Sequence, residues 1–68
     1  MDTQKTPFEQ LDAAASSKGV DLRHAVRRAG FSHMMYYGLK RGGDIMLGNF
    51  YKIERAIDDL AEEKLKAG

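Results

Sequence analysis

Three glycines divide this sequence into short segments, and that division constrains the fold more than any other feature. Gly19, Gly30 and Gly42 each follow a segment in which apolar residues recur at three- and four-residue spacing. A glycine just past the last periodic residue ends a helix, because it adopts the left-handed conformation at no steric cost. The chain as far as Gly42 is therefore predicted to form three short helices joined by tight turns.

The first helix is predicted to begin at Pro7 and to end near Lys18. Thr6 and Glu9 have the spacing of a capping box, in which each side chain hydrogen-bonds to the backbone of the other residue. Proline is favoured at the first helical position. The apolar face of this helix comprises Phe8, Leu11 and Ala15.

The next two helices form a pair around the turn at Gly30. The second helix is predicted from Leu22 to Ala29, with Asp21 as its N-cap. The third helix is predicted to follow Ser32, its N-cap, and to end at residue 40 or 41, before Gly42.

A last helix is predicted to begin between Leu47 and Phe50, with Asn49 as one candidate cap. Its apolar stripe has 3-4-3 spacing and comprises Phe50, Ile53, Ile57 and Leu60. The residues from Asp58 onward either continue this helix or form a fifth short one, and the sequence leaves both open. The expected fold is all-α, a single domain of four to five helices over residues 1–68, with residues 1–5 as a flexible N-terminus.

The length and composition exclude several classes of protein. A chain of 68 residues has room for one small core, and such a core rarely supplies more than about 3 to 5 kcal/mol, so oligomerisation is expected. The absence of cysteine excludes disulfides, thiolate catalysis and cysteine-based zinc sites. No apolar run approaches the roughly 18 residues of a membrane span, and we expect a soluble, cytoplasmic protein.

Basic residues are concentrated in the middle of the chain. The net charge is only +1, but residues 22–43 carry five basic side chains and no acidic one. Residues 1–21 carry two bases and four acids, and residues 45–68 carry four bases and five acids. This distribution is expected of a chain that presents one face to an anion and its other faces to water.

Small, apolar and capping residues around the Gly30 turn have a familiar spacing. The matching residues are Gly19, Val20 and Asp21 at the first turn, Val26 four residues before Gly30, Phe31 and Ser32 at the second turn, Tyr36 and Leu39 at two buried positions, Gly42 at the end, and Leu47 to Ile57 as a fourth helix. Over Phe8 to Leu60 the sequence thus resembles the lambda-repressor-like helix-turn-helix family, the Cro and cI type of DNA-binding domain. The resemblance implies that the third helix is a recognition helix.

Two positions depart from the family's pattern. The family often begins its second helix with a glutamine that touches a DNA phosphate, and here that position is Leu22, so the contact is lost or passes to Arg23. Gly38 lies inside the predicted recognition helix, where glycine costs about 1 kcal/mol relative to alanine. Two explanations of Gly38 stay open, namely close approach of the backbone to DNA and relief of crowding against a neighbouring helix.

At about 100° per residue, the side chains of the predicted recognition helix project to two opposite faces. Tyr36 and Leu39 point to the core, with Met35 at the edge. The opposite face would lie in the major groove, which is about 12 Å wide and admits one helix. The residues expected to contact bases there are His33, Met34, Tyr37 and Gly38.

Basic side chains around this helix are expected to contact phosphates and not merely to be solvated. The start of the last helix, near Asn49, also offers free amides and a favourable dipole. Arg28 projects elsewhere and is expected only to be solvated. The residues expected to bind phosphates are Arg23, Arg27, Lys40, Arg41 and Asn49.

Other polar residues carry weaker signals. His24 and His33 lie on different helices without metal-ligand spacing, and His24 is expected to be a plain surface histidine. Glu54, Asp58 and Glu62 form a stripe that is expected to face solvent, not a catalytic pocket. No catalytic residue, metal site, cofactor or small-molecule ligand is predicted.

The resemblance implies a sequence-specific regulator, in particular a repressor, that binds an inverted-repeat operator in double-stranded DNA as a homodimer. Leu60 and Leu65 lie past the part of the last helix expected for the core and are the predicted dimer interface. The small size resembles regulators of phage and mobile-element operons, including anti-CRISPR-associated autorepressors.

Two other classes of function are weighed against this one. An antitoxin- or adaptor-like module would bind a basic partner through the acidic last helix. An enzyme is the least expected, because the sequence has no paired nucleophile and base, metal cluster or glycine-rich phosphate loop.

Overall fold

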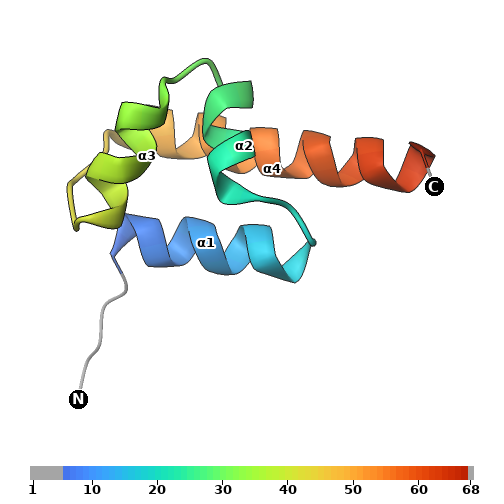
Figure 1. Ribbon diagram of the computed structural model, residues 1–68, viewed down its shortest axis with the longest axis horizontal. Helices are drawn as coiled ribbons and strands as arrows, with labels where there is room; N and C mark the ends of the chain where they lie inside the picture. The colour runs from blue at the N-terminus through green and yellow to red at the C-terminus, as the bar shows by residue number, and fades with distance from the viewer. Residues whose placement is uncertain (1–5, 68) are drawn as a thin grey trace.

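Four helices make up the computed structural model, which describes residues 6–67 (Figure 1). They are α1 (Pro7–Ser17), α2 (Leu22–Arg28), α3 (His33–Lys40) and α4 (Leu47–Ala67). The described residues contain no strand, so the predicted all-α fold is confirmed. The prediction of a flexible N-terminus concerns residues 1–5, which lie outside the described residues.

The longest helix, α4, packs against both α1 and α2. α3 packs against α1 and α2 at one end of the bundle, and the last turns of α4 extend past the other helices at the opposite end (Figure 1). Two helices therefore hold α3 in place, and His33, Met34, Tyr37 and Lys40 remain exposed on it.

The three glycine turns share one hydrogen-bond pattern, the Schellman motif. After α2, the Gly30 N–H donates to the Arg27 carbonyl (3.0 Å) and the Phe31 N–H donates to the Val26 carbonyl (3.2 Å). The equivalent bonds run from Gly19 to Ser16 and Val20 to Ala15 after α1, and from Gly42 to Leu39 and Gly43 to Gly38 after α3. The first glycine of each motif has a positive φ (68°, 97° and 98°), so the predicted left-handed turns are confirmed.

The predicted N-caps of α1 and α2 are confirmed. Thr6 and Glu9 form both hydrogen bonds of the capping box, at 3.0 and 3.1 Å. The Asp21 carboxylate accepts a hydrogen bond from the Arg23 N–H at 3.0 Å. Ser32 occupies the N-cap position of α3, but its side chain makes no capping hydrogen bond.

α4 begins before its predicted cap. The Phe50 N–H donates to the Met46 carbonyl at 2.9 Å, and the first helical residue is Leu47. The predicted start between Leu47 and Phe50 is confirmed, but Asn49, one candidate cap, lies inside the first turn and is not the N-cap. The hydrogen bond to Met46 starts the helix three residues earlier than a cap at Asn49 would require.

The second half of α4 continues as one helix to Ala67, which decides between the two alternatives left open after Asp58. Polar contacts with α2 and with the end of α1 hold this half. They are the ion pairs Lys18–Asp58 and Arg28–Glu63, and a 2.6 Å hydrogen bond from the Lys64 ammonium to the Gly19 carbonyl.

Two predictions about charged residues are therefore wrong. Arg28 is not merely solvated, because both of its terminal nitrogens contact the Glu63 carboxylate. Asp58 is not merely part of a solvated stripe, because it pairs with Lys18. Each pair joins residues at least 35 positions apart, so neither contact can be inferred before the path of α4 is known.

The core lies where the four helices meet. Its buried side chains are Leu11, Ala15, Leu22, Ala25, Val26, Leu39, Ile53, Ala56 and Ile57. Leu22 is therefore a core residue and cannot take the phosphate contact that the resemblance assigns to its position. Leu60 is partly buried and packs against the same core, so the prediction that it lies past the core is wrong. Leu65 is 82% exposed.

Candidate nucleic-acid interface

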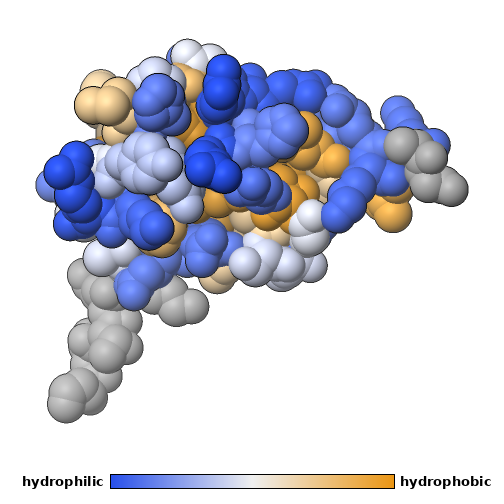
Figure 2. Space-filling model, viewed as in Figure 1, coloured by the Kyte–Doolittle hydropathy of each residue, from blue (hydrophilic) through white to orange (hydrophobic). Residues whose placement is uncertain are grey.

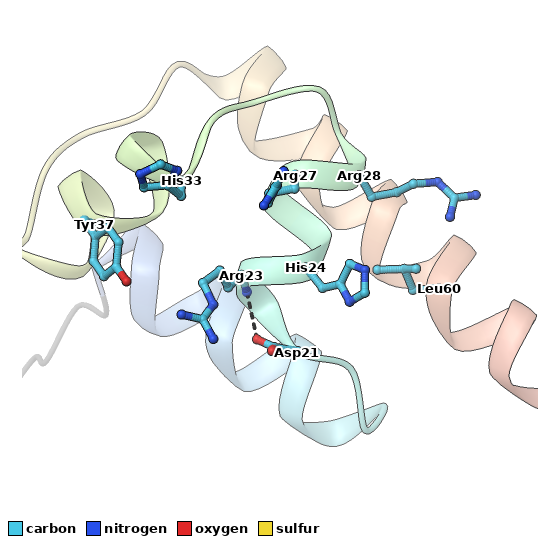
Figure 3. Close-up of a pocket in the computed structure, with 8 residues that line it drawn as sticks. All are labelled: Asp21, Arg23, His24, Arg27, Arg28, His33, Tyr37 and Leu60. Carbon is cyan, nitrogen blue, oxygen red and sulfur yellow. Dashed lines mark hydrogen bonds between the residues drawn. The ribbon is translucent and has the colours of Figure 1, made fainter.

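A basic depression of about 690 Å³ lies between α2, α3 and the middle of α4 (Figure 3). The residues that line it are Asp21, Arg23, His24, Arg27, Arg28, His33, Tyr37 and Leu60. Three arginines and two histidines thus share one hollow with a single carboxylate. That carboxylate caps α2 by accepting the Arg23 N–H. The depression therefore carries an excess of hydrogen-bond donors, which suits an anionic partner.

Arg23 and Tyr37 connect α2 to α3 across this depression. Interaction with the Tyr37 side chain is the main cause that raises the pKa of the Arg23 guanidinium, and the negative charge of Asp21 raises it further. Figure 3 shows the Arg23 side chain extended from α2 toward α3. Since arginine is charged at any ordinary pH, this raised pKa leaves the protonation of Arg23 unchanged.

The ring of Tyr37 contacts two neighbouring aromatic rings of α3. Its ring contacts that of His33 edge-on at a centroid distance of 6.1 Å and that of Tyr36 at 5.3 Å. Tyr36 in turn contacts Phe8 of α1 at 5.7 Å. Edge-to-face pairs of this kind are favourable arrangements of aromatic rings. The exposed side chains of α3 are therefore anchored through Tyr36 to the core.

The basic side chains predicted to bind phosphates are exposed. Arg23, Arg27, Lys40 and Arg41 form no ion pair within residues 6–67. Arg28 differs, because Glu63 neutralises it and raises the pKa of its guanidinium. Figure 2 shows strongly hydrophilic residues over α2, whereas the surface over α3 also includes paler and hydrophobic residues. The four unpaired cations remain available to a partner outside the chain.

The structure groups some predicted site residues and separates others. Arg23, Arg27, His33 and Tyr37 share the basic depression. The other predicted residues on or near α3 lie outside it, namely Met34, Gly38, Lys40 and Arg41. Asn49 lies in the first turn of α4, where the amides of residues 47–49 precede the first helical hydrogen bond. These amides keep the donor capacity expected of a helix start.

One of the two explanations of Gly38 is wrong. A Cβ atom built at Gly38 meets no atom within 4 Å apart from its own helix backbone and chain neighbours, so no neighbouring helix crowds this position. Gly43 is different, since a Cβ there would lie 2.8 Å from the Gly38 carbonyl oxygen. Close approach of the backbone to an outside partner stays as the prediction for Gly38.

Sequence reasoning missed two features of this surface. His24 lines the basic depression, and its spacing of three and four residues from Arg27 and Arg28 was a signal that the three share a helix face. Met46, Leu47 and Tyr51 are large apolar side chains that remain exposed. Their position outside the 3-4-3 stripe of α4 was the signal, since residues off that stripe point away from the core.

Comparisons with protein-family models, with curated proteins and with solved structures found no match to this chain. Among residues 6–67 there is no cluster of three or more histidine, aspartate or glutamate side chains that could hold a metal ion. None of the described helices is long and apolar enough to cross a membrane. The functional argument therefore rests on the basic depression and the exposed face of α3.

Proposed function

We propose that this chain is a sequence-specific DNA-binding transcriptional regulator, specifically a repressor, that acts in the cytoplasm as a homodimer on an inverted-repeat operator. The observation that carries the proposal is the set of unpaired, exposed cations on α2 and at the end of α3. They are Arg23, Arg27, Lys40 and Arg41, and they flank the uncovered face of α3.

In this proposal α3 enters the major groove. The groove is about 12 Å wide and admits one helix, whose N-terminal residues reach base edges most directly. His33 and Met34 are the first two residues of α3, and both are exposed. Tyr37 lies one turn later, beside His33. These three side chains and the bare backbone of Gly38 would contact the bases.

Phosphate contacts would come from both sides of α3. Arg23 and Arg27 line the depression next to His33 and Tyr37, so a DNA strand on that side would meet two guanidinium groups. Lys40 and Arg41 lie at the opposite end of α3. Such contacts fix the position of a protein on DNA and give a salt-dependent affinity, whereas the base contacts give sequence preference.

The biological setting follows from resemblance alone. A small regulator of a phage or mobile-element operon, including an autorepressor of the anti-CRISPR-associated kind, is the setting that we propose. Two such chains on an inverted repeat would double the few base contacts that one α3 makes.

A binding assay with two variants tests this function. We expect the double substitution Tyr37→Ala with Arg41→Ala to reduce the affinity for duplex DNA at least tenfold, because it removes one expected base contact and one expected phosphate contact. Lys66→Ala is the matched control, since Lys66 is an exposed cation in the last turn of α4, and it should leave the affinity within twofold.

Unchanged DNA affinity in the double variant, together with loss of a protein partner, would favour the antitoxin- or adaptor-like alternative. The structure offers that alternative less support than the sequence does. Asp58 and Glu63, two of the acidic residues of α4, are already paired with Lys18 and Arg28. Fewer acidic side chains of α4 are therefore left for a basic partner.

A further inference from the structure

An exposed apolar surface lies at the start of α4. Met46, Leu47 and Tyr51 are 75%, 65% and 57% exposed, although large apolar side chains are usually buried. Leu47 and Tyr51 line one hollow of about 330 Å³ with the partly buried side chains of Ile45 and Phe50. We call the surface formed by these five residues the α4 start surface. Apolar patches of this kind mark sites of interaction.

We propose that a second copy of this chain docks on the α4 start surface, so that the homodimer of the proposed function forms there. The residues that line the hollow beside it carry no charge, namely Pro7, Gln10, Ile45, Leu47, Phe50 and Tyr51. A two-fold contact pairs a surface with itself, so a surface that carries charges of one sign would meet like charges. An uncharged surface avoids this repulsion.

The competing surface around Leu65 does not have this property. The hollow beside Leu65 is lined by Lys18, Ala61 and Lys64 as well. Lys18 is paired with Asp58, but Lys64 keeps its charge, so pairing that surface with itself would bring the Lys64 ammonium groups of the two copies together. Leu65 is also a single exposed apolar residue, whereas Met46, Leu47 and Tyr51 lie together. The structure therefore favours the α4 start surface over the interface predicted from Leu60 and Leu65.

The spacing of DNA half-sites favours the same surface, and this step rests on the proposed function. Half-sites one helical turn apart require recognition helices about 34 Å from each other, or about 17 Å from the two-fold axis. Pro7 lines the hollow beside the α4 start surface, and the ring of the next residue, Phe8, lies 5.7 Å from that of Tyr36 of α3 between centroids. An axis through this surface therefore passes close to both copies of α3.

An axis at Leu65 places the two copies of α3 further apart. α3 joins the start of α4 through the short loop after Lys40, and Leu65 lies 18 residues further along α4 than Leu47. At about 1.5 Å per residue, this is about 27 Å along the helix. Two α4 helices that extend away from an axis at Leu65 would hold their recognition helices much more than 34 Å apart.

The size of the surface fits the centre of a dimer interface. Three of its side chains, those of Met46, Leu47 and Tyr51, are more than half exposed, and adjoining exposed apolar side chains of this kind form functional patches. A standard interface covers about 800 Å² on each partner, with an apolar centre and a polar rim. Tyrosine and methionine are among the residues enriched in such centres.

Sedimentation equilibrium of three proteins without DNA tests the proposal. We expect the wild type to dimerise and the double variant Leu47→Gln with Tyr51→Gln to have a dimer dissociation constant at least tenfold higher. Leu65→Gln is the matched control and should change it less than twofold. Glutamine keeps the net charge and suits a helix, and circular dichroism checks that each variant folds. A monomeric wild type, or a dimer lost only with Leu65→Gln, contradicts the proposal.

Crosslinking gives a second measurement, whose result does not depend on whether the glutamine substitutions destabilise the fold. The chain has no cysteine, so Met46→Cys and Leu65→Cys each introduce a single thiol at a highly exposed position. Mild oxidation should give covalent dimers of Met46→Cys at least tenfold faster than of Leu65→Cys. Equal rates, or the reverse order, overturn the assignment.

A DNA-binding measurement on the same double variant distinguishes failure of this inference from failure of the proposed function. The Leu47→Gln and Tyr51→Gln double variant should lose at least tenfold in affinity for an inverted repeat and keep its affinity for a single half-site within twofold. Failure of the wild type to bind any half-site overturns the DNA-binding proposal, while the dimer surface is judged by sedimentation and crosslinking alone.

Discussion

Arg23 of α2 and Tyr37 of α3 both line the basic depression, and the interaction of Arg23 with Tyr37 is the main cause that raises the pKa of the Arg23 guanidinium. Tyr37 also contacts the ring of His33, so one tyrosine touches both a predicted phosphate contact and a predicted base contact. The hydroxyl and the ring of Tyr37 therefore have separable roles.

The variant Tyr37→Phe separates the role of the Tyr37 hydroxyl from that of its ring. The ring contacts with His33 and Tyr36 remain in this variant, but Arg23 loses its interaction with the Tyr37 hydroxyl. We expect operator affinity to fall about threefold, less than a buried charged hydrogen bond would give because both side chains are exposed. The preferred base sequence should stay the same. Fluorescence anisotropy measures the affinity, and a changed sequence preference would show that the hydroxyl itself contacts a base.

Arg27→Gln tests a phosphate contact. Each phosphate contact contributes about 0.9 to the slope of log affinity against log salt concentration, so we expect the slope to fall by about that amount. The loss should be similar for operator and unrelated duplexes. Lys66→Gln removes the same charge from the far end of α4 and should leave the slope unchanged. Equal slopes for Arg27→Gln and the wild type would remove Arg27 from the interface.

Gly38→Ala should change stability and DNA binding in opposite directions. A Cβ at this position meets no neighbouring helix, and alanine is favoured over glycine in a helix by about 1 kcal/mol. The thermal midpoint should therefore rise by about 4 to 8 °C. Operator affinity should fall at least fivefold, because the added methyl group keeps the backbone from the groove. A more stable variant with full affinity would leave Gly38 without a role in binding.

Local signals explain why the fold could be predicted from the sequence. The capping pair Thr6 and Glu9, the cap Asp21 and the glycines after each short helix act within four or five residues, and the structure contains all of them. Each signal depends on side chains and backbone groups that are close in the sequence. The bounds of α1, α2 and α3 follow from them to within one residue.

Contacts between distant residues explain what could not be predicted. Arg28 and Glu63 meet only because α4 continues past Asp58 and crosses α2, and neither condition can be inferred from the residues alone. His24 belongs to the basic depression for the same reason, since Leu60 of α4 closes that side of it. Helical phase did place Tyr36 and Leu39 toward the core and His33 and Tyr37 toward the surface.

The Arg28–Glu63 pair makes a pH-dependent contribution to stability. The Arg28 guanidinium lowers the pKa of Glu63 in the folded chain, so the pair stabilises the fold above the ordinary pKa of glutamate and is lost as the pH falls through the lowered value. A double-mutant cycle with Arg28→Gln and Glu63→Gln should show a favourable coupling at pH 7 that disappears in acid. High salt should weaken it as well, because both side chains are partly exposed. Coupling that grows in acid would contradict this assignment.

Selection from random duplex DNA at two salt concentrations tests the central claim most directly. The chain should enrich an inverted repeat with half-sites about one helical turn apart. Affinity for the enriched sequence should fall steeply with salt, as expected when Arg23, Arg27, Lys40 and Arg41 contact phosphates. Absence of any enriched sequence, or binding that does not respond to salt, would contradict the claim that this chain is a sequence-specific DNA-binding regulator.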